Sequence, residues 1–401
     1  MLNRTTTAVL VLLCLTSTAW SAPSVILSWD NTGDYGPQTA GTKTAGWQEA
    51  IDACVREGRD LYIQGGWGGR KAIYHTSETI RIPATQDFRI DGGVYVLNWT
   101  GPADDPTKDL LVIDSTMNGE YHFGIMVYGG AGAALRLRPE NPVPIDGFSV
   151  VVETVITSQG IADPRPFEPG ERKAGTGLVF DGSKAPIVSS RFDFIGGILN
   201  FKTCVETIGA FTQNEFNCLH LHTNAHKSTL FNLGPTSTQN TLKCVIGVDQ
   251  GAQDVLGFRV QGRNNRIELN TRGGFPKGNE LLLDTTATGN RIDFIQGKPV
   301  FEADDYLTDH AETPTNALHW TGGNPAPKTL VFPAGKQTYT QRLTPATLRV
   351  TSGTCTSLTL TRGTVAMDHT TTASTPITAS VGDILQLECT SEVHLEALPV
   401  P

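Results

Sequence analysis

The sequence is poor in several classes of residue, and each shortage argues against a class of protein. Of 401 residues, 18% are charged and 7% aromatic, and methionine occurs only 4 times. Lysine and arginine (31) are outnumbered by aspartate and glutamate (40), giving a net charge of −9. Without a basic excess, nucleic acids and anionic membrane surfaces are poor partners. Thr, Val, Ile and Gly dominate over Glu, Lys and Met, which disfavours a helical bundle and favours a turn-rich β protein.

Long apolar runs are equally scarce, and the one near the N-terminus is too short to cross a bilayer. Residues 8–15 form this run. It follows Arg4 and precedes small residues at Ala19 and Ser21. The order of positive charge, apolar stretch and small residues predicts a signal peptide over residues 1–21. The alternative is a buried N-terminal strand. We therefore expect a secreted protein, extracellular or periplasmic, with no membrane span.

A repeat is the most informative feature that the sequence does contain. A five-residue pattern of small polar, polar, apolar, polar and apolar residues recurs about every 25 residues. Its copies begin at Ser190, Asn214, Asn240, Asn265 and Asn290. Alternating polar and apolar residues indicate a strand with one buried face. The period leaves room for three short strands and three turns, so the repeat predicts a β-solenoid whose coils stack at the spacing of strands in a sheet.

Stacking places equivalent residues of successive coils above one another. The first apolar positions predict one buried column (Phe192, Phe216, Leu242, Ile267 and Ile292). The second apolar positions predict another (Phe194, Cys218, Cys244, Leu269 and Phe294). The repeated asparagines predict a ladder at a bend, where asparagine adopts a left-handed backbone and bonds neighbouring backbone groups. The adjacent cysteines Cys218 and Cys244 form either a disulfide or two stacked thiols.

The ends of the predicted solenoid have their own signals. Residues 45–57 read as an amphipathic helix followed by Gly58, a suitable cap for the first apolar rung. We expect the solenoid to occupy residues 22–320. Residues 336–401 turn rich in threonine and predict a small C-terminal β domain. Cys355 and Cys389 lie in this segment. Because the domain is small and the expected compartment oxidising, we expect them to form a disulfide.

Three N-terminal segments carry a resemblance to a known family. These are GWQEAIDAC (46–54), DLYI (60–63) and YHTSETIRIP (74–83). They resemble the cap helix and first strands of proteins of the pectate lyase superfamily. The resemblance implies an all-β fold, a right-handed single-stranded parallel β-helix, in a protein that acts on polysaccharide. The Asp-Asp and Gly-His-Gly signatures of polygalacturonase-like members are absent at matching positions, so no catalytic residue is carried over.

Candidate site residues come from the polar positions of the repeat, which face outward. The first outward column contains Arg191, Glu215, Thr241, Arg266 and Arg291, and the second contains Asp193, Asn217, Lys243, Glu268 and Asp293. One interpretation is a sugar-acid groove, with Lys243, Glu215 and Arg266 in catalysis and Arg191, Asn217, Glu268 and Arg291 in substrate binding. The alternative is a solvated ladder whose charges pair between coils. Hydrolysis would need two carboxylates about 5–9.5 Å apart. Glu215 and Glu268, two coils apart, lie roughly 10 Å from one another.

Three of the nine histidines fall between residues 219 and 227. His220 and His222 share one face of a strand, and His226 follows. Such a group can supply a general base or bind a transition metal, or it can be two surface histidines beside an apolar stripe. Counting residues from the start of each repeat aligns His222 with Ile198 and Val248, which suggests that the face of the strand carrying His222 could point inward. No carboxylate aligns with the histidines, so the sequence predicts no metal site and no cofactor. It does not decide whether the protein uses a divalent cation.

These features predict a secreted protein that acts on polysaccharide or oligosaccharide. The preferred chemistry is β-elimination on an acidic glycan, with His220 and His222 among the catalytic residues and arginine or lysine neutralising a uronate. A non-catalytic glycan-binding or adhesive β-helix is the main alternative. A glycoside hydrolase that uses Glu215 with a neighbouring aspartate is the third.

Overall fold

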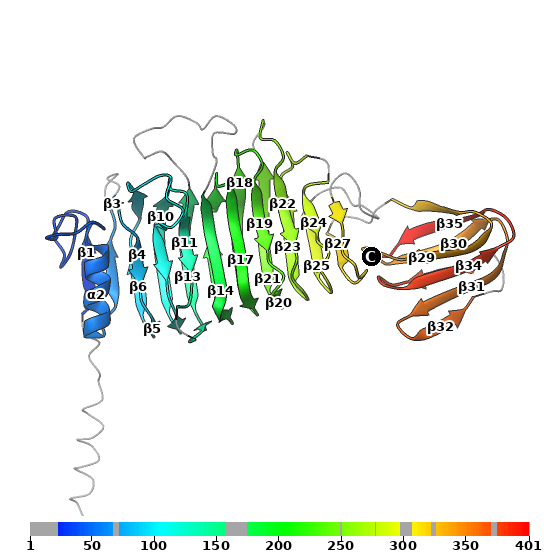
Figure 1. Cartoon of the computed structure of the whole chain (residues 1–401), viewed down its shortest axis with the longest axis horizontal. Coiled ribbons are helices and arrows are strands. Elements are labelled where there is room, and N and C mark those ends of the chain that lie inside the picture. Colours follow the sequence, from blue (N-terminus) through cyan, green and yellow to red (C-terminus); the bar gives the residue numbers. More distant parts are fainter. Residues whose placement is uncertain are drawn as a thin grey trace, which may run out of the picture.

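The chain folds into a stack of β-coils with a different cap at each end (Figure 1). The computed structural model describes residues 23–66, 72–140, 142–156, 175–248, 251–276, 278–296, 307–321, 326–369 and 375–400. The predicted signal peptide lies outside these residues. Within them the chain is a parallel β-solenoid of about 8 turns, with one helix near its N-terminal end and two small antiparallel sheets after it. The predicted fold class is confirmed.

Two long parallel sheets, A and B, form the walls of the solenoid. Sheet A runs through β1 (Val25–Ser28), β2 (Leu61–Gln64), β6 (Arg89–Gly92), β10 (Glu120–Val127), β13 (Ser149–Ile156), β15 (Arg191–Phe194), β18 (Glu215–Thr223), β21 (Thr241–Val248), β23 (Arg266–Thr271), β25 (Arg291–Gln296) and β27 (Ala317–Trp320), with β3 (Ala72–Thr76), β7 (Tyr95–Trp99) and β16 (Ile198–Leu199) beside this path. Sheet B runs through β4 (Ile80–Ile82), β8 (Leu111–Ile113), β11 (Ala133–Leu137), β14 (Thr176–Val188), β17 (Thr203–Thr212), β19 (Thr229–Leu233), β22 (Leu256–Val260), β24 (Leu281–Leu283) and β26 (Leu307–Asp309). The short strands β5 (Thr85–Gln86), β9 (Thr116–Met117), β12 (Ile145–Asp146) and β20 (Ser237–Thr238) pair beside sheet B.

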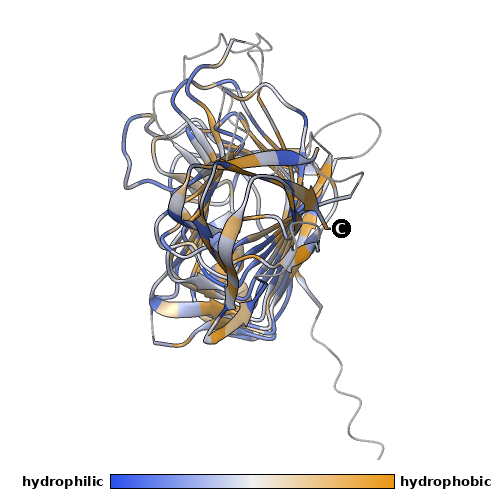
Figure 2. Ribbon diagram, turned by 90° about the vertical axis from the view of Figure 1, so that its right-hand side faces the viewer, coloured by the Kyte–Doolittle hydropathy of each residue, from blue (hydrophilic) through white to orange (hydrophobic). Residues whose placement is uncertain are grey.

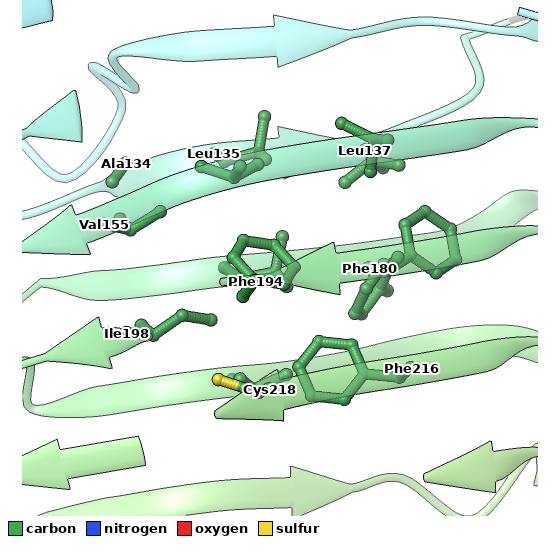
Figure 3. Packing of buried hydrophobic residues seen from close by; sticks show 14 of the residues in the cluster. Ala134, Leu135, Leu137, Val155, Phe180, Phe194, Ile198, Phe216 and Cys218 are labelled. Atoms are coloured by element: carbon green, nitrogen blue, oxygen red, sulfur yellow. The ribbon is translucent and has the colours of Figure 1, made fainter. Parts of the chain in front are cut away.

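The predicted repeats stack in the expected register. In β15, β18, β21, β23 and β25 the first apolar column aligns residue by residue. A sixth copy, β27, continues the column with Leu318. Figure 3 shows apolar side chains from both sheets packed between the walls, among them Phe180, Phe194 and Phe216. Viewed along the long axis, hydrophobic and hydrophilic segments alternate along the ribbons, as one buried face per strand requires (Figure 2).

Cys218 and Cys244 align in this core as free, buried thiols. Burial raises the pKa of the Cys218 thiol to about 12. A thiol that stays protonated in an apolar column packs as a small hydrophobic side chain. Of the two alternatives, the structure therefore shows stacked thiols.

The asparagine ladder forms, but the left-handed residues lie one position earlier than predicted. The positive φ angles belong to the preceding residues Gln213 (57°), Gln239 (58°), Asn264 (54°) and Gly289 (65°). The ladder asparagines are buried instead. Each Oδ1 accepts the backbone N–H of the ladder residue one coil before, as in Asn240 N–H to Asn265 Oδ1 (3.0 Å). Each Nδ2 donates to the next Oδ1 and to a backbone carbonyl, so the side chains replace a ladder of backbone bonds at the corner. The ladder extends to Asn316.

Both ends of the apolar stack are closed. Helix α2 (Trp47–Glu57) buries Trp47, Ala50, Ile51 and Cys54 and ends at Gly58, which is left-handed (φ 64°) as expected for a helix terminus. At the other end Leu343, 2% exposed, joins the same core and forms an isolated parallel bridge with Ala317.

Two four-stranded antiparallel sheets, C and D, enclose a second core after the solenoid. Sheet C contains β28 (Lys328–Phe332), β35 (Val393–Pro399), β30 (Ala346–Ser352) and β33 (Ile377–Ala379). Sheet D contains β29 (Gly335–Thr340), β34 (Ile384–Cys389), β31 (Cys355–Arg362) and β32 (Val365–Asp368). Arg342 links these sheets to the solenoid. Its guanidinium contacts Asp309, the last residue of β26, at 2.9 Å.

Cys355 and Cys389 lie directly opposite one another in sheet D as free thiols, with their Sγ atoms 3.1 Å apart. The predicted disulfide therefore stays a prediction, and we expect an oxidant to form it. Closing a loop of 34 residues should stabilise the C-terminal sheets by about 4 kcal/mol. Desolvation and the neighbouring thiol raise the pKa of Cys355, so oxidation should be slow at neutral pH.

Intact mass and guanidinium titration, with and without reductant, measure both effects. Cys355→Ala is the control, because it should unfold at the midpoint of the reduced wild type under both conditions. If the wild-type protein still has all its thiols free after treatment with an oxidant, the prediction is contradicted.

Candidate functional site

The outer face of sheet A carries two adjacent columns of polar side chains over β15, β18, β21, β23 and β25. We call them the charge ladder, and its residues align as predicted. The first column contains Arg191, Glu215, Thr241, Arg266 and Arg291, and the second contains Asp193, Asn217, Lys243, Glu268 and Asp293.

Every arginine and lysine of the charge ladder contacts a carboxylate. The pairs are Arg191 with Asp193 (2.7 Å) and Glu215 (3.5 Å), Lys243 with Glu268 (4.0 Å), Arg266 with Glu268 (3.1 Å) and Asp293 (3.2 Å), and Arg291 with Asp293 (2.9 Å). The four cations are roughly half exposed, so each pair adds little to stability. This pattern matches the alternative of a solvated ladder. A cation already held by a carboxylate is a weak receptor for a second one.

One part of the charge ladder brings two carboxylates together. The Nδ2 atom of Asn217 contacts Asp193 Oδ1 at 2.8 Å and Glu215 Oε1 at 3.3 Å. The two carboxylate oxygens are therefore at most about 6 Å apart, an upper bound that admits the separation of about 5–5.5 Å used by retaining glycosidases. Glu215 and Glu268 are separated by the intervening strand β21 and share no such contact.

The histidines lie further along the same face. Strand β18 bulges, so that Leu221 and not His222 aligns with Ile198 and Ile246. The alignment of His222 with inward positions, expected from counting, is therefore wrong. Leu221 is fully buried, whereas His220 and His222 are half-buried, with ring centroids 4.9 Å apart.

A buried glycine, Gly247, lies next to these rings. His222 pairs with Gly247 on β21, and Arg272 follows on the next coil, where its N–H donates to Ile246. A Cβ atom on Gly247 would lie 3.3 Å from His222 Cδ2, 3.5 Å from Arg272 Cβ and 3.8 Å from His220 Nε2. Two imidazoles and a guanidinium-bearing residue thus pack around Gly247, where a larger side chain would crowd His222. We call these four residues the His–Arg notch.

Arg272 differs from the cations of the charge ladder. It is exposed, and among the described residues no carboxylate lies within ion-pair distance of it. Sequence reasoning missed this residue because it lies beyond the five-residue repeat. An alignment of the coils beyond the five repeated residues would bring Arg272 close to His222 only if it allowed for the extra residue in the bulge of β18.

His226 does not join the notch. Its Nδ1 accepts the N–H of Gln253 at 2.9 Å, and its carbonyl accepts a hydrogen bond from the Lys202 ammonium. Burial and the nearby Lys227 lower the pKa of Lys202. These contacts give His226 a structural role in the turn. Within the described residues, no group of three or more His, Cys, Asp or Glu side chains could hold a metal ion.

In the described part of the chain, no helix has the length and hydrophobicity needed to span a bilayer.

Comparison with known proteins gives weak similarity to solved structures and no match by sequence. No family model and no curated protein matches the sequence. Among solved structures, a tailspike of Acinetobacter phage vB_ApiP_P1 is 10% identical, with 90% of this chain and 85% of that chain covered and a TM-score of 0.31. The Dettilon tailspike is also 10% identical, at 93% and 94% coverage and a TM-score of 0.22. The tailspike of Acinetobacter baumannii phage Fri1, a capsular polysaccharide depolymerase, is 9% identical, at 95% and 85% coverage and a TM-score of 0.32.

Proposed function

We propose that this protein is secreted and cleaves an acidic polysaccharide by β-elimination at the His–Arg notch. The observation that carries the proposal is the gathering of two histidines and Arg272 around Gly247 on the outer face of sheet A, where Arg272 is exposed and has no ion-pair partner among the described residues. Secretion is proposed from the signal-peptide pattern of residues 1–21.

The chemistry follows from the residue types. A uronate carboxylate beside the Arg272 guanidinium becomes a better electron acceptor, which makes the neighbouring C5–H more acidic. An imidazole of the notch removes that proton as general base. The C5–H electron pair forms a C4=C5 double bond and the C4–O bond breaks. The departing glycosidic oxygen takes a proton from water, and the imidazolium returns the proton that it removed to solvent. The product is one new reducing end and one unsaturated uronate.

We assign the charge ladder to binding and not to proton transfer. Arg191, Lys243, Arg266 and Arg291 are engaged with carboxylates, and Glu215, Asn217 and Glu268 offer further acceptors for sugar hydroxyls. Lys243 lies four residues before Gly247 on β21, with outward-facing Val245 between them. Its removal should therefore weaken substrate binding more than turnover.

The test is incubation of the mature protein with a panel of uronate polymers, followed by absorbance at about 235 nm, where the enol-ether product of β-elimination absorbs. We expect the absorbance to rise together with new reducing ends on at least one polymer. Binding to a polymer without either signal would contradict the lyase proposal and support a non-catalytic glycan-binding protein.

A specific observation favours hydrolysis as the second candidate. Asp193 and Glu215 both accept a hydrogen bond from the Asn217 amide nitrogen, which keeps these oxygens within about 6 Å of one another, an upper bound that admits a retaining mechanism. Under this alternative, reducing ends appear without absorbance at about 235 nm. Glu215→Gln would then abolish cleavage, whereas Arg272→Ala would leave it intact.

A further inference from the structure

An apolar hollow opens on the outer face of sheet A, beside Asp193 and Asn217 of the charge ladder. Its volume is about 330 Å³, and its lining residues are Val151, Asp193, Phe194, Ile195, Asn217 and Leu219. The exposed fractions are 48% for Ile195 and 61% for Leu219, which is high for aliphatic side chains that stand next to one another on a sheet face. Grouped exposed apolar side chains in a hollow, unlike scattered ones, mark a contact surface.

One wall of the hollow carries hydrogen-bond acceptors. Asp193 Oδ1 and Oδ2 each accept one bond, from Asn217 Nδ2 and Arg191 Nε, so each retains a lone pair. The amide of Asn217 donates to Asp193 and Glu215, which turns its carbonyl oxygen away from those carboxylates. Among the described residues no donor bonds this carbonyl oxygen. The wall therefore presents acceptors next to aliphatic carbon.

A ligand complementary to this hollow has a hydrogen-bond donor immediately beside a methyl group. A hydroxyl group alone supplies the donor without the methyl, and an O-acetyl group supplies the methyl without the donor. In a 6-deoxy sugar the nearest hydroxyl oxygen that can lie beside the methyl is three bonds from it, one bond more than the nitrogen of an acetamido group. An acetamido group supplies both, because its N–H adjoins the sugar ring and its methyl lies two bonds further along. The hollow is large enough for a pyranose substituent of this size.

We propose that the apolar hollow binds the N-acetyl group of an acetamido sugar, with the N–H donating to Asp193 or Asn217 Oδ1 and the methyl packing on Ile195 and Leu219. The inference deepens the proposed function, since it adds an acetamido sugar to the acidic glycan. It would make the substrate a polymer with both an acidic and an N-acetylated unit.

Saturation-transfer NMR on the full mature protein tests the proposal without any cleavage. The probes are N-acetylglucosamine, N-formylglucosamine, which lacks the methyl, and 2-O-acetylglucose, which lacks the N–H. We expect transfer to the acetyl methyl of N-acetylglucosamine and an affinity about fivefold weaker for each analogue, the contribution of one methyl or one hydrogen bond.

Leu219→Ser should remove that transfer, and Ile295→Ser is the matched control. Ile295 is another exposed isoleucine of sheet A (45%), two strands beyond β21, outside the hollow. Both positions are exposed, so both variants should keep the wild-type circular dichroism. Absence of transfer in the wild-type protein, equal transfer in Leu219→Ser, or equal affinity for 2-O-acetylglucose would overturn the proposal. Arg272→Ala should bind N-acetylglucosamine normally, which separates this inference from the lyase chemistry.

Discussion

Arg272→Ala should lower kcat/KM on the cleaved uronate polymer by about 100–1,000-fold, the effect of removing one preorganised charge at a developing anion. The loss should appear mainly in kcat, since the guanidinium contributes most when the carboxylate gains electron density. Absorbance kinetics at saturating polymer measure it. Circular dichroism should be unchanged, because Arg272 is exposed and forms no ion pair with the described residues.

Arg263→Ala is the matched control. Arg263 is also exposed, but it lies at another corner of the solenoid, where its backbone forms isolated β-bridges with Thr238 and Thr288. It should keep wild-type activity. If both variants retain full activity, Arg272 does not neutralise the substrate and the His–Arg notch is not the site.

Gly247→Val tests the same site by displacing the histidine rings instead of removing the arginine. The backbone of Gly247 lies outside the left-handed region, so a β-branched residue fits the strand conformation there. Its Cβ would stand 3.3 Å from His222 Cδ2, closer than most Cβ contacts, so the imidazole would have to move. We expect loss of activity with an unfolding midpoint close to that of the wild type, because the half-buried ring of His222 can shift while the coil stays folded. Full activity in this variant would show that the reaction does not depend on the position of the His222 ring.

Asn265→Ala should destabilise the solenoid by about 3–5 kcal/mol, the second large effect. Asn265 Oδ1 accepts both the backbone N–H and the Nδ2 of Asn240, and its own Nδ2 donates to Ser237 O and Asn290 Oδ1. All four partners are buried or at the buried corner, and alanine leaves them without a replacement. The midpoint of guanidinium unfolding, followed by circular dichroism, measures the loss.

Two variants make the result specific. Asn232→Ala removes an asparagine from the outer face of sheet B, where it makes one long bond to Glu206 (3.4 Å), and should change stability by less than about 1 kcal/mol. Asn265→Ser should recover part of the loss, because Ser190 occupies the same column and its Oγ accepts the N–H of Phe148. Equal stability of the alanine variants at positions 265 and 232 would show that the ladder is not a stabilising element.

The repeat was predictable because its signal is local. Alternating apolar residues at a fixed period dictate which side chains share a column, and the residues from Phe192 to Ile292 aligned as expected. The same argument could have added Leu318. The left-handed corner was predicted one residue too late. At a turn, asparagine can either adopt the left-handed conformation itself or use its buried side chain to bond neighbouring backbone groups, and here it does the second.

The candidate site was predictable only in part. The columns of charged residues followed from the repeat. Whether these residues form ion pairs depends on how far their side chains reach across coils, which only the folded structure shows, as in the contacts of Arg266 with both Glu268 and Asp293. The sequence pointed to the histidines as candidate site residues, but it did not show that His222 faces outward. A bulge in β18 adds one residue and reverses the inward–outward alternation beyond it.

The sequence by itself determined that this chain is a β-solenoid with a helical cap, since period, alternation and turn residues are local properties that every coil repeats. Only the tertiary structure decided what the outer face can do. Arg272 and Gly247 lie beyond the repeated pattern, and the bulge brings His222 into register with Gly247, one coil from Arg272. A register shift of one residue moves a side chain from the core to the surface, and no local pattern shows where such a shift occurs.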